Sequence, residues 1–309
     1  MAKLIEITGK ALSGEWGKDD ETGNGIPVLR TTNFTNEGVI DYNSVVTRTI
    51  TKKNIGEKFL RKGDIIIEKS GGSEKFPVGR VVYFDGDDNT YLFNNFTGLL
   101  RVKEPKIWYP RYVFYSLFAN YKRGGTRMFE NKTTGLHNLK TDDYVSRYEV
   151  TEIDMFEQVS VCDKLDRLYE IVNERKQQLE LLDELVKARF VEMFGDPRSN
   201  PFGFEKKMLK DTCKVITGNT PSRAIAEYYG DYIEWIKTDN IVSGILNPTQ
   251  ATESLSEKGM NVGRTVEKDS ILMACIAGSI ASIGRVCITD RTVAFNQQIN
   301  AVVPERYNI

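Results

Sequence analysis

The chain repeats itself. Pro77–Val102 reads PVGRVVYFDGDDNTYLFNNFTGLLRV, and Ser282–Val303 reads SIGRVCITDRTVAFNQQINAVV. Both segments contain Gly-Arg-Val, a short hydrophobic run with a polar turn, Phe-Asn followed by a second amide, and another hydrophobic run. Solenoid repeats recur every ~20–50 residues, so a repeat at this much longer distance indicates a duplicated domain.

Further pairs extend the repeat. Gly25–Phe34 (GIPVLRTTNF) aligns with Tyr232–Ile241 (YIEWIKTDNI), and Lys53–Ile67 aligns with Lys258–Leu272. Short β-branched runs such as GDIIIEK, GRVVYF and INAVVP are bounded by Gly, Asp and Asn, which is typical of strands and turns. We therefore expect an α+β protein with two β-rich copies of one domain.

A different pattern separates the two copies. Thr151–Phe194 contains neither glycine nor proline, and the segment ends at Gly195 and Pro197. Apolar residues recur every three or four positions along this segment, and two arginines, Arg175 and Arg189, interrupt the series. This spacing is typical of the contact stripe, or seam, of a coiled coil. The apolar seam positions are Leu165, Leu168, Val172, Leu179, Leu182, Val186 and Met193. Some 40 residues form a rod of about 60 Å, too long to be covered by one small domain, so we expect this helix to pair with another helix.

These patterns divide the chain into three regions. We expect a first β-rich domain at 1–150, a long helical spacer at 151–195 and a second β-rich domain at 196–309. The 309 residues suffice for two domains that each bury a core. Few residues follow Phe295 and Asn296, so the second copy is expected to be incomplete, as a fragment or a naturally shortened form.

Composition limits the possible functions. With a net charge of −1 and a pI near 6.1, the chain has no overall attraction for nucleic acid, so any such binding must come from local patches. A single histidine, His137, and four cysteines without a CxxC spacing argue against a zinc site or a disulfide framework and favour a reducing cytoplasm. The N-terminus lacks the apolar core of a signal peptide. The longest uncharged run, Ser270–Gly284, is too short for a membrane helix and predicts a buried strand.

Catalytic patterns are incomplete. Asn200–Phe204 (NPFGF) is similar to the Asn-Pro-Pro-aromatic motif of amino-methyltransferases, but its second proline is missing and no Gly-rich cofactor strand precedes it. The Gly-rich runs SGGSEKFPVGR and AGSIASIGR lack the Gly-Lys-Ser/Thr ending of a phosphate-binding P-loop. His137 has no partner that its spacing identifies. We interpret these segments as turns and packing residues.

A nuclease is the remaining catalytic alternative. Gly63–Lys69 (GDIIIEK) offers Asp64, Glu68 and Lys69, the residue types that hold Mg²⁺ and orient water. The alignment sets Asp64 opposite Asp269, but Glu68 and Lys69 face Met273 and Ala274. The usual spacing of glutamate, one residue and lysine is also absent. We therefore expect no catalytic residue and no bound metal in this chain.

The polar residues shared by the copies suit binding to double-stranded DNA. Arg and Lys can bond guanine, Asn and Gln can bond adenine, and Ser and Thr can bond bases or phosphates. Candidates in the first copy are Arg30, Thr31, Thr32, Lys69, Ser70, Arg80, Asn94 and Asn95. Candidates in the second copy are Lys237, Thr238, Ser279, Arg285, Asn296 and Gln297. The basic run YKRGGTRMFENKTTG adds possible phosphate contacts from Lys122, Arg123, Arg127 and Lys132. Two such readers on a rigid rod predict a bipartite, asymmetric target with an unread spacer.

The chain resembles the specificity subunit of type I restriction-modification systems. ITGNTPSRAIAEYYGDYIEWIKTDNI resembles the start of a target-recognition domain, and SILMACIAGSIASIGRVCITDRTVAFNQQINAVVP resembles its centre. TTGLHNLKTDDY and the run from LDRLYEIVNERK to FGDP resemble the entry to a conserved helix. The chain departs from the family where TEIDMFEQ replaces a proline-rich turn before the helix, and where the second half is short.

The resemblance implies two β-rich target-recognition domains held apart by conserved helices, in a subunit without catalytic activity. Two DNA adenine methyltransferase subunits would dock on those helices, and a motor-nuclease subunit would join them. The cofactor, S-adenosylmethionine, would be bound by the methyltransferase and not by this chain. The family pairs two such helices antiparallel, whereas this chain has one, so a homodimer through the helix is a hypothesis. A coiled-coil interaction scaffold without a DNA role is the alternative function.

Overall fold

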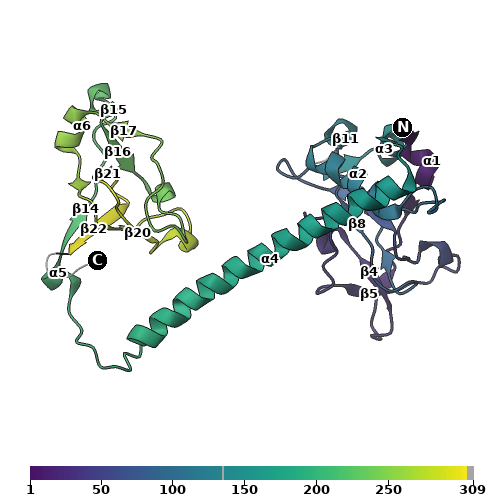
Figure 1. Ribbon diagram of the computed structural model, residues 1–309, viewed down its shortest axis with the longest axis horizontal. Helices are drawn as coiled ribbons and strands as arrows, with labels where there is room; N and C mark the ends of the chain where they lie inside the picture. The colour runs from purple at the N-terminus through teal and green to yellow at the C-terminus, as the bar shows by residue number, and fades with distance from the viewer. Residues whose placement is uncertain (134–135, 305–309) are drawn as a thin grey trace. The chain divides into compact units, whose positions relative to one another are not determined.

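The computed structural model describes residues 1–133 and 136–304. The chain divides into two units, Met1–Lys187 and Ala188–Ile309, and the long helix α4 (Met155–Phe194) runs through the boundary (Figure 1). Each unit is built mainly from short strands in two larger sheets. The predicted α+β class, with two β-rich copies and one long helix, is confirmed.

The first unit contains two four-stranded sheets. The first sheet is antiparallel, and its strands in order are β2 (Leu12–Ser13), β10 (Thr97–Leu100), β6 (Ile65–Glu68) and β8 (Val81–Tyr83). The second sheet has the order β3 (Lys18–Asp19), β5 (Val46–Thr49), β4 (Ile26–Leu29) and β9 (Leu92–Phe93). Its β4–β9 pair is parallel. The smaller pairings join β11 (Glu130–Thr133), β12 (Leu136–Leu139) and β7 (Ser70–Gly71), and β1 (Ala2–Lys3) with β13 (Glu149–Val150).

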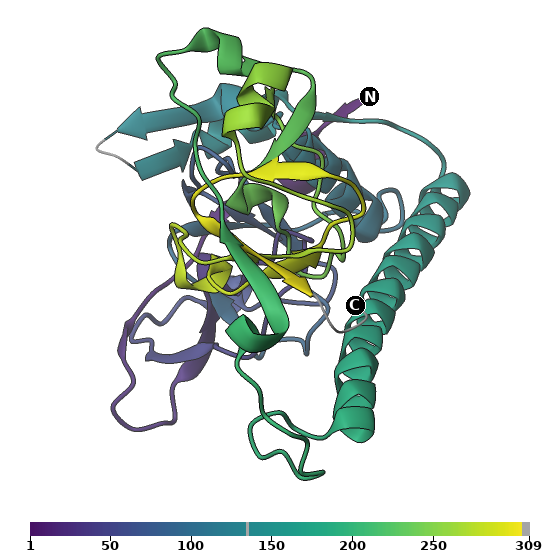
Figure 2. The same cartoon turned by 90° about the vertical axis from the view of Figure 1, so that its left-hand side faces the viewer.

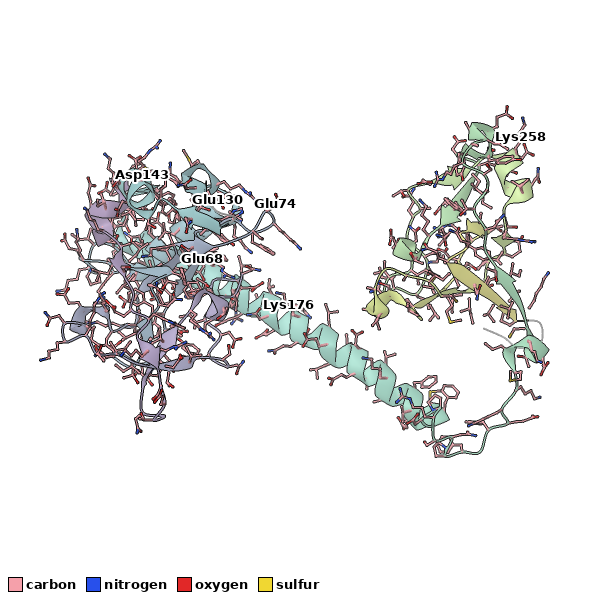
Figure 3. The ribbon with its side chains drawn as sticks, turned by 180° about the vertical axis from the view of Figure 1, so that it is seen from behind. Glu68, Glu74, Glu130, Asp143, Lys176 and Lys258 are labelled. Carbon is pink, nitrogen blue, oxygen red and sulfur yellow. The ribbon has the colours of Figure 1, made fainter. Side chains whose placement is uncertain are left out.

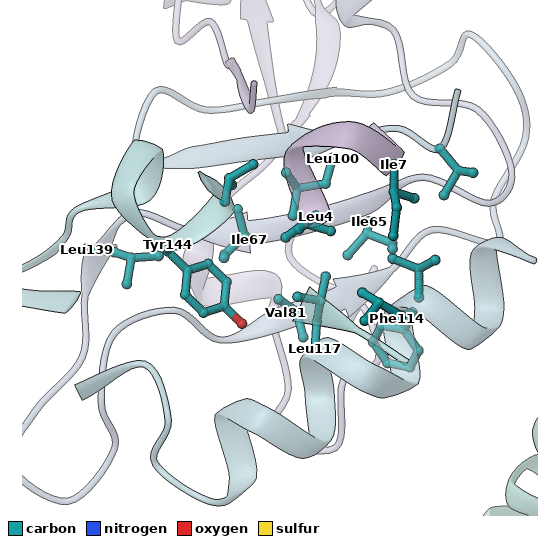
Figure 4. Close-up of a cluster of buried hydrophobic side chains, with 14 of the residues drawn as sticks. Leu4, Ile7, Ile65, Ile67, Val81, Leu100, Phe114, Leu117, Leu139 and Tyr144 are labelled. Atoms are coloured by element: carbon teal, nitrogen blue, oxygen red, sulfur yellow. The ribbon is translucent and has the colours of Figure 1, made fainter. Parts of the chain in front are cut away.

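Strand β6 separates two hydrophobic cores in the first unit. Successive side chains of a strand point to opposite faces, so Ile65 and Ile67 join one core and Ile66 joins the other. Figure 4 shows the first core, which three helices cover. These helices are α1 (Leu4–Thr8), α2 (Pro110–Lys122) and α3 (Thr141–Arg147).

The second unit repeats this plan (Figure 2). Its antiparallel sheet has the order β14 (Cys213–Thr217), β22 (Ile299–Pro304), β19 (Ile271–Ala274) and β20 (Val286–Ile288). Its other sheet has the order β15 (Tyr229–Gly230), β17 (Ser254–Leu255), β16 (Ile233–Ile236), β21 (Val293–Phe295) and β18 (Thr265–Val266). The β16–β21 pair is parallel, as β4–β9 is in the first unit. Short helices α5 (Leu209–Thr212) and α6 (Glu257–Val262) complete the unit.

Short 3-10 helices link the strands in both units. They are η1 (Thr31–Asn33), η2 (Gly56–Lys58), η3 (Arg127–Phe129), η4 (Ala226–Tyr228), η5 (Thr238–Asn240) and η6 (Ile280–Ser282). Among the described residues, no helix combines the length and the hydropathy needed to cross a membrane.

The structure corrects the alignment of the central strands by one residue. The amide of Gly63 donates to the Phe84 carbonyl at 2.9 Å, and the amide of Asp269 donates to the Thr289 carbonyl at 2.7 Å. Gly63 and Asp269 are therefore equivalent, and both have positive φ values, of 96° and 64°. Aspartate tolerates this left-handed conformation better than most residues. The expected equivalence of Asp64 with Asp269 is wrong, and Glu68 aligns with Ala274 instead of Met273.

Helix α4 begins against the first unit and then continues with exposed side chains. The Asp154 carboxylate accepts from the Glu157 amide at 2.8 Å, which caps the helix. Gln158 and Cys162 are buried. Further along, the seven predicted apolar seam residues are each 37–68% exposed. Figure 3 shows side chains projecting from the middle of α4, with Lys176 among them.

Gln158 fixes the start of α4. Its Oε1 accepts from the Tyr109 amide at 2.8 Å, and its Nε2 donates to the carbonyls of Ile107 and Ile153 at 2.9 Å each. Two turns later Asp166 accepts from Arg111 of α2, with a closest N–O distance of 2.6 Å. These partly buried polar contacts hold the first turns of the helix against the unit.

Candidate nucleic-acid interface

Three strands end together in each unit, and the predicted residues lie just beyond these ends. In the first unit the Asn94 amide donates to Leu29, the last residue of β4, at 2.9 Å. The amide of Lys69, just after β6, donates to Phe96 at 2.7 Å. In the second unit the Asn296 amide donates to Ile236 at 3.0 Å. The loops that follow β4, β6 and β9, and their counterparts, therefore meet at one edge of each unit.

Two buried asparagines shape the first of these loops. Asn33 accepts from the Arg30 amide at 2.9 Å and donates to the Asp41 carbonyl at 3.0 Å. Asn240 accepts from the Lys237 amide at 3.0 Å and donates to the Gln250 carbonyl at 3.0 Å. These asparagines are missing from the predicted set, although their identical position in the RTTN and KTDN segments was a signal. They fix the backbone of each loop, in which the preceding residues Thr32 and Asp239 are exposed.

Arg80 braces the same loop from the side. Its guanidinium donates to the carbonyls of Thr31 at 2.9 Å and Phe34 at 2.8 Å, and lies 3.3 Å from the Glu68 carboxylate. Burial raises the pKa of Glu68, and the charge of Arg80 opposes that rise. Arg285 is different: its Nε donates to the Ala281 carbonyl at 3.1 Å, and Ala274 replaces the glutamate. The two Gly-Arg-Val segments therefore enter equivalent strands, β8 and β20, but their arginines bond different partners.

Most of the other predicted side chains in the first unit are engaged within it. Lys69 donates to Ser13 at 2.8 Å, and burial, followed by the charge of Lys58, lowers its pKa. Ser70 donates to Asn138 at 2.5 Å. Asn94 is buried, whereas Thr32 and Asn95 are exposed. Thr32 and Asn95 are therefore the members of this set that solvent or a ligand can reach most directly.

The second unit shows the same division. Lys237 forms an ion pair with Glu253 at 2.6 Å, and Asn296 accepts from the Gln298 amide at 3.1 Å. Ser279 lies in an exposed loop, 2.9 Å from the Ser282 hydroxyl. Gln297 is exposed and accepts from the Thr220 hydroxyl. Thr238 is half-buried.

A basic cavity of about 370 Å³ lies on the first unit. It is lined by Asn36, Lys75, Phe76, Pro77, Tyr121, Lys122, Arg123, Gly124 and Arg127. Lys122 donates to the Asn36 carbonyl at 3.0 Å and Arg127 to the Glu74 carbonyl at 3.1 Å. Bonds to carbonyls leave the positive charges uncompensated, so the cavity suits an anion such as a phosphate. Lys75 was not predicted, and the side chain of Lys132 lies outside the described part of the chain.

The carboxylates of the nuclease alternative are both bound by arginines. Arg101 donates to the two oxygens of Asp64 at 2.8 and 2.6 Å, and Arg80 pairs with Glu68. Within residues 1–133 and 136–304, no group of three or more His, Cys, Asp or Glu side chains is arranged to hold a metal. Asn200 bonds the amide and the carbonyl of Phe204, at 2.9 and 2.8 Å, which forms a turn.

Comparison with known proteins finds a similarity in the second unit. Residues 201–309 match the family model of the type I restriction modification DNA specificity domain. A curated relative, the type I restriction enzyme HindI specificity subunit of Haemophilus influenzae, is 36% identical over 107 residues. That alignment covers 34% of this chain and 22% of the relative, so the chain spans about a fifth of that protein's length.

Two solved structures share the fold of nearly the whole chain. One is a chain from a study of complex assembly and conformational transition of the type I R-M system, with a TM-score of 0.55 and 15% identity. It covers 99% of this chain and 76% of its own length. The other, the type I restriction-modification S subunit from M. genitalium, has a TM-score of 0.55 and 14% identity over 100% of this chain and 73% of its own. The predicted family resemblance is confirmed.

Proposed function

We propose that this chain is the DNA-recognition subunit of a type I restriction-modification complex and reads a bipartite target. The observation that supports this most strongly is the repeated fold: the two antiparallel sheets have the same strand order, the other two sheets share the order of four strands, and three strands end together in each unit. Residues 201–309 match the DNA specificity domain, and the first unit repeats most of the sheet topology of the second. Two similar readers with different loop residues suit two different half-sites.

The residues divide into readers, phosphate contacts and supports. The exposed amides and hydroxyls of Asn95, Gln297 and Thr32 have the donor and acceptor groups that read base edges. Lys75, Lys122, Arg123 and Arg127 suit phosphates, which fix register without reading sequence. Arg80 and Asn296 support the loops through their side chains, and Asn94 does so through its backbone amide.

The partners follow from the same proposal. We infer that α4 docks DNA adenine methyltransferase subunits, which bind S-adenosylmethionine and flip the target adenine, and that a motor-nuclease subunit joins through them. In this arrangement the chain itself is non-catalytic and acts in the cytoplasm. The four cysteines are free thiols, as suits a reducing compartment.

One experiment tests DNA recognition directly. The full chain is purified with its methyltransferase partner, and binding to DNA is measured by gel shift at several salt concentrations, while methylome sequencing compares hosts with and without the gene. We expect a bipartite methylated motif that depends on the gene, and binding that weakens steeply with salt. If the methylome does not change and the complex binds all sequences equally, the proposal is wrong.

The exposed seam of α4 supports a second proposal, a homodimer through this helix. Arg175 and Arg189 lie on the seam. In a parallel pair each arginine would lie opposite the same arginine of the other copy, and the two positive charges would repel, so antiparallel pairing is favoured. We expect the full chain to dimerise at micromolar concentration and Leu179→Glu with Leu182→Glu to make it monomeric. Gln177→Glu, on the opposite side of the helix, is the matched control. Light scattering coupled to size exclusion decides, and a monomeric wild-type chain would contradict the dimer.

The same seam favours the alternative function, a coiled-coil scaffold without a DNA role. The gel shift separates the two functions, because a scaffold would dimerise through α4 but would not bind DNA in a sequence-dependent way. Substituting Arg123 and Lys122 by alanine provides a second discriminator. It lowers DNA affinity if the basic cavity holds a phosphate and leaves a pure scaffold unchanged.

A further inference from the structure

Arg223 of the second unit is an arginine that is absent from the predicted DNA-binding set. The loops after β16, β19 and β21 meet at one edge of this unit, which we call the reading edge. The Nη2 of Arg223 donates to one oxygen of Glu253 at 2.7 Å, and the other oxygen accepts from Lys237 at 2.6 Å. Lys237 directly follows β16. One carboxylate therefore holds Arg223 at the reading edge, beside a residue that the sequence predicts to contact DNA.

The backbone that carries Arg223 is fixed along the same edge. The Thr220 hydroxyl donates to the side chain of Gln297, which directly follows the Phe-Asn segment after β21. The Pro221 carbonyl accepts from the Tyr229 hydroxyl at 2.6 Å. These bonds hold the segment on both sides of its proline, so Arg223 lies on a positioned loop between the two predicted contacts.

The guanidinium of Arg223 also lies over two aromatic rings. Its Cζ is 4.5 Å from the centre of the Tyr229 ring and 5.3 Å from that of Trp235. Tyr229 belongs to β15 and Trp235 to β16, and both strands pair with β17 (Figure 1). The Trp235 ring is itself held, because its Nε1 donates to the Asn219 carbonyl at 3.3 Å. A guanidinium that is stacked and paired in this way loses little conformational freedom when it binds a ligand.

Most donors of Arg223 remain free for a ligand. An arginine has five N–H donors in a planar fork. Within residues 1–133 and 136–304, the guanidinium of Arg223 makes one hydrogen bond, the one from Nη2 to Glu253. Its side chain is 56% exposed. A planar fork matches the O6 and N7 acceptors that guanine presents in the major groove, and this pairing is the commonest specific contact to a base.

The first unit has a related arginine that is not available in this way. The Arg48 guanidinium lies 3.8 Å from the centre of the Trp16 ring and pairs with Asp19. The side chain of Arg48 is only 15% exposed, so it braces the sheet from within. The helices that follow β10 pack on the first core and leave the Asp19 side chain 87% exposed. This side of the sheet is therefore open to solvent in both units, but only in the second does an arginine reach out from it.

The charge of the cluster suits DNA. Arg223 and Lys237 share the single carboxylate of Glu253, which leaves one of the two positive charges uncompensated. The bonds from Lys237 and then from Arg223 lower the pKa of Glu253, so this carboxylate stays ionised at neutral pH. The three side chains together attract the phosphate backbone, while the stacking on Tyr229 and Trp235 fixes the plane of the guanidinium.

We propose that Arg223 reads a guanine in the half-site bound by the second unit, and that Glu253 is its positioning residue. The fork of Arg223 donates to O6 and N7 of that guanine. This proposal rests on the proposed DNA recognition and adds to it a specific base and a specific residue. Such a contact contributes roughly 5- to 150-fold to the discrimination against other bases.

The test uses the full chain with its methyltransferase partner and the target sequence that the methylome provides. In each duplex one guanine of the target is replaced by 7-deazaguanine, which lacks the N7 acceptor, and binding is measured by fluorescence anisotropy. We expect one guanine whose replacement weakens binding of the wild type at least fivefold but leaves binding of Arg223→Met unchanged. Methionine keeps an aliphatic chain over the rings and removes the donors. Arg198→Met, the same change at an exposed arginine in the turn after α4, should respond like the wild type.

A second variant leaves Arg223 in place. Glu253→Gln removes a negative charge from the reading edge, so binding to unrelated DNA should become tighter. At the same time the guanidinium loses its ionic partner, so the penalty of 7-deazaguanine should become smaller. A carboxylate that only stabilises the fold would not move these two quantities in opposite directions, and thermal unfolding of each variant verifies that the unit is folded.

Three outcomes would overturn the proposal. If Arg223→Met weakens binding to target and unrelated DNA equally and lowers the slope of log affinity against log salt by about 1, Arg223 contacts a phosphate. A 7-deazaguanine penalty that persists in Arg223→Met, or a half-site of the second unit without guanine, would equally exclude it. In these three cases the wild type still binds its target, so DNA recognition stands. A wild-type complex without sequence preference would contradict both proposals.

Discussion

Asn33 and Asn240 serve structure beside residues that the sequence predicted as DNA contacts. Both are buried, and both bond the amide three residues earlier as well as a distant carbonyl. We expect Asn240→Ala to lower the free energy of unfolding of the second unit by about 1–3 kcal/mol, because buried backbone groups lose their partner. Hydrogen exchange of β16 measures the change. Thr238→Ala is the control and should shift it by less than about 0.5 kcal/mol.

A second residue-scale prediction concerns pH. Arg291 donates to both oxygens of Glu234, at 3.0 and 2.8 Å, and these bonds are the main reason why the pKa of Glu234 is lowered. A carboxyl with a lowered pKa in the folded state stabilises the fold above its unfolded pKa, and this contribution is lost as pH falls through the folded value. We expect the wild type to lose stability below about pH 4.5 more steeply than Glu234→Gln. Denaturant titrations of both proteins at pH 7 and pH 3 measure this, and equal losses would contradict it.

The sequence could not separate readers from supports at this scale. Arg80 and Arg285 occupy the same Gly-Arg-Val segment, yet only Arg80 has a buried glutamate beside it. The partner of Arg80, Glu68, is 12 residues away in the chain and adjacent only after β6 pairs with β8. Local patterns give the residue type and the approximate place of a side chain. Long-range pairing decides what it touches.

At the scale of elements, the junction between the first unit and α4 depends on Gln158. Its side chain makes three hydrogen bonds to backbone groups of Tyr109, Ile107 and Ile153. We expect Gln158→Met to destabilise the first unit by about 2–4 kcal/mol, because those buried groups become unsatisfied. Thermal unfolding measures it. Glu157→Gln, an exposed neighbour, should change little, and an equal loss in both variants would mean that the bonds of Gln158 are not responsible.

The elements themselves were largely predictable. The 40 residues of α4 lie within a long run that has neither glycine nor proline. Many of the strands coincide with short β-branched runs that have turn residues at their ends. The one-residue error in the alignment of β6 with β19 arose because both copies have aspartate near the strand start. Only Asp269 takes the left-handed conformation, the place that Gly63 has in the first unit. The φ angle distinguishes these two aspartates, whereas the amino-acid sequence alone does not.

For the whole molecule, recognition by two units predicts that each half-site can be altered separately. We expect Thr32→Ala with Asn95→Ala to relax base preference in one half of the methylated motif, and Gln297→Ala to relax it in the other half. Each lost base contact should cost about 1–3 kcal/mol of discrimination, or roughly 5- to 150-fold. Methylome sequencing of hosts that express each variant with its methyltransferase measures both halves at once.

The control for this prediction is Lys176→Ala on the exposed middle of α4 (Figure 3). It removes a positive charge from the helix and leaves the loops of both units unchanged, so both half-sites should keep their preference. Separate readers require that the two sets of loop variants act on different halves. If Gln297→Ala and the Thr32, Asn95 pair relax the same half, the two units jointly read one site. The duplication would then extend a single interface instead of creating a second one.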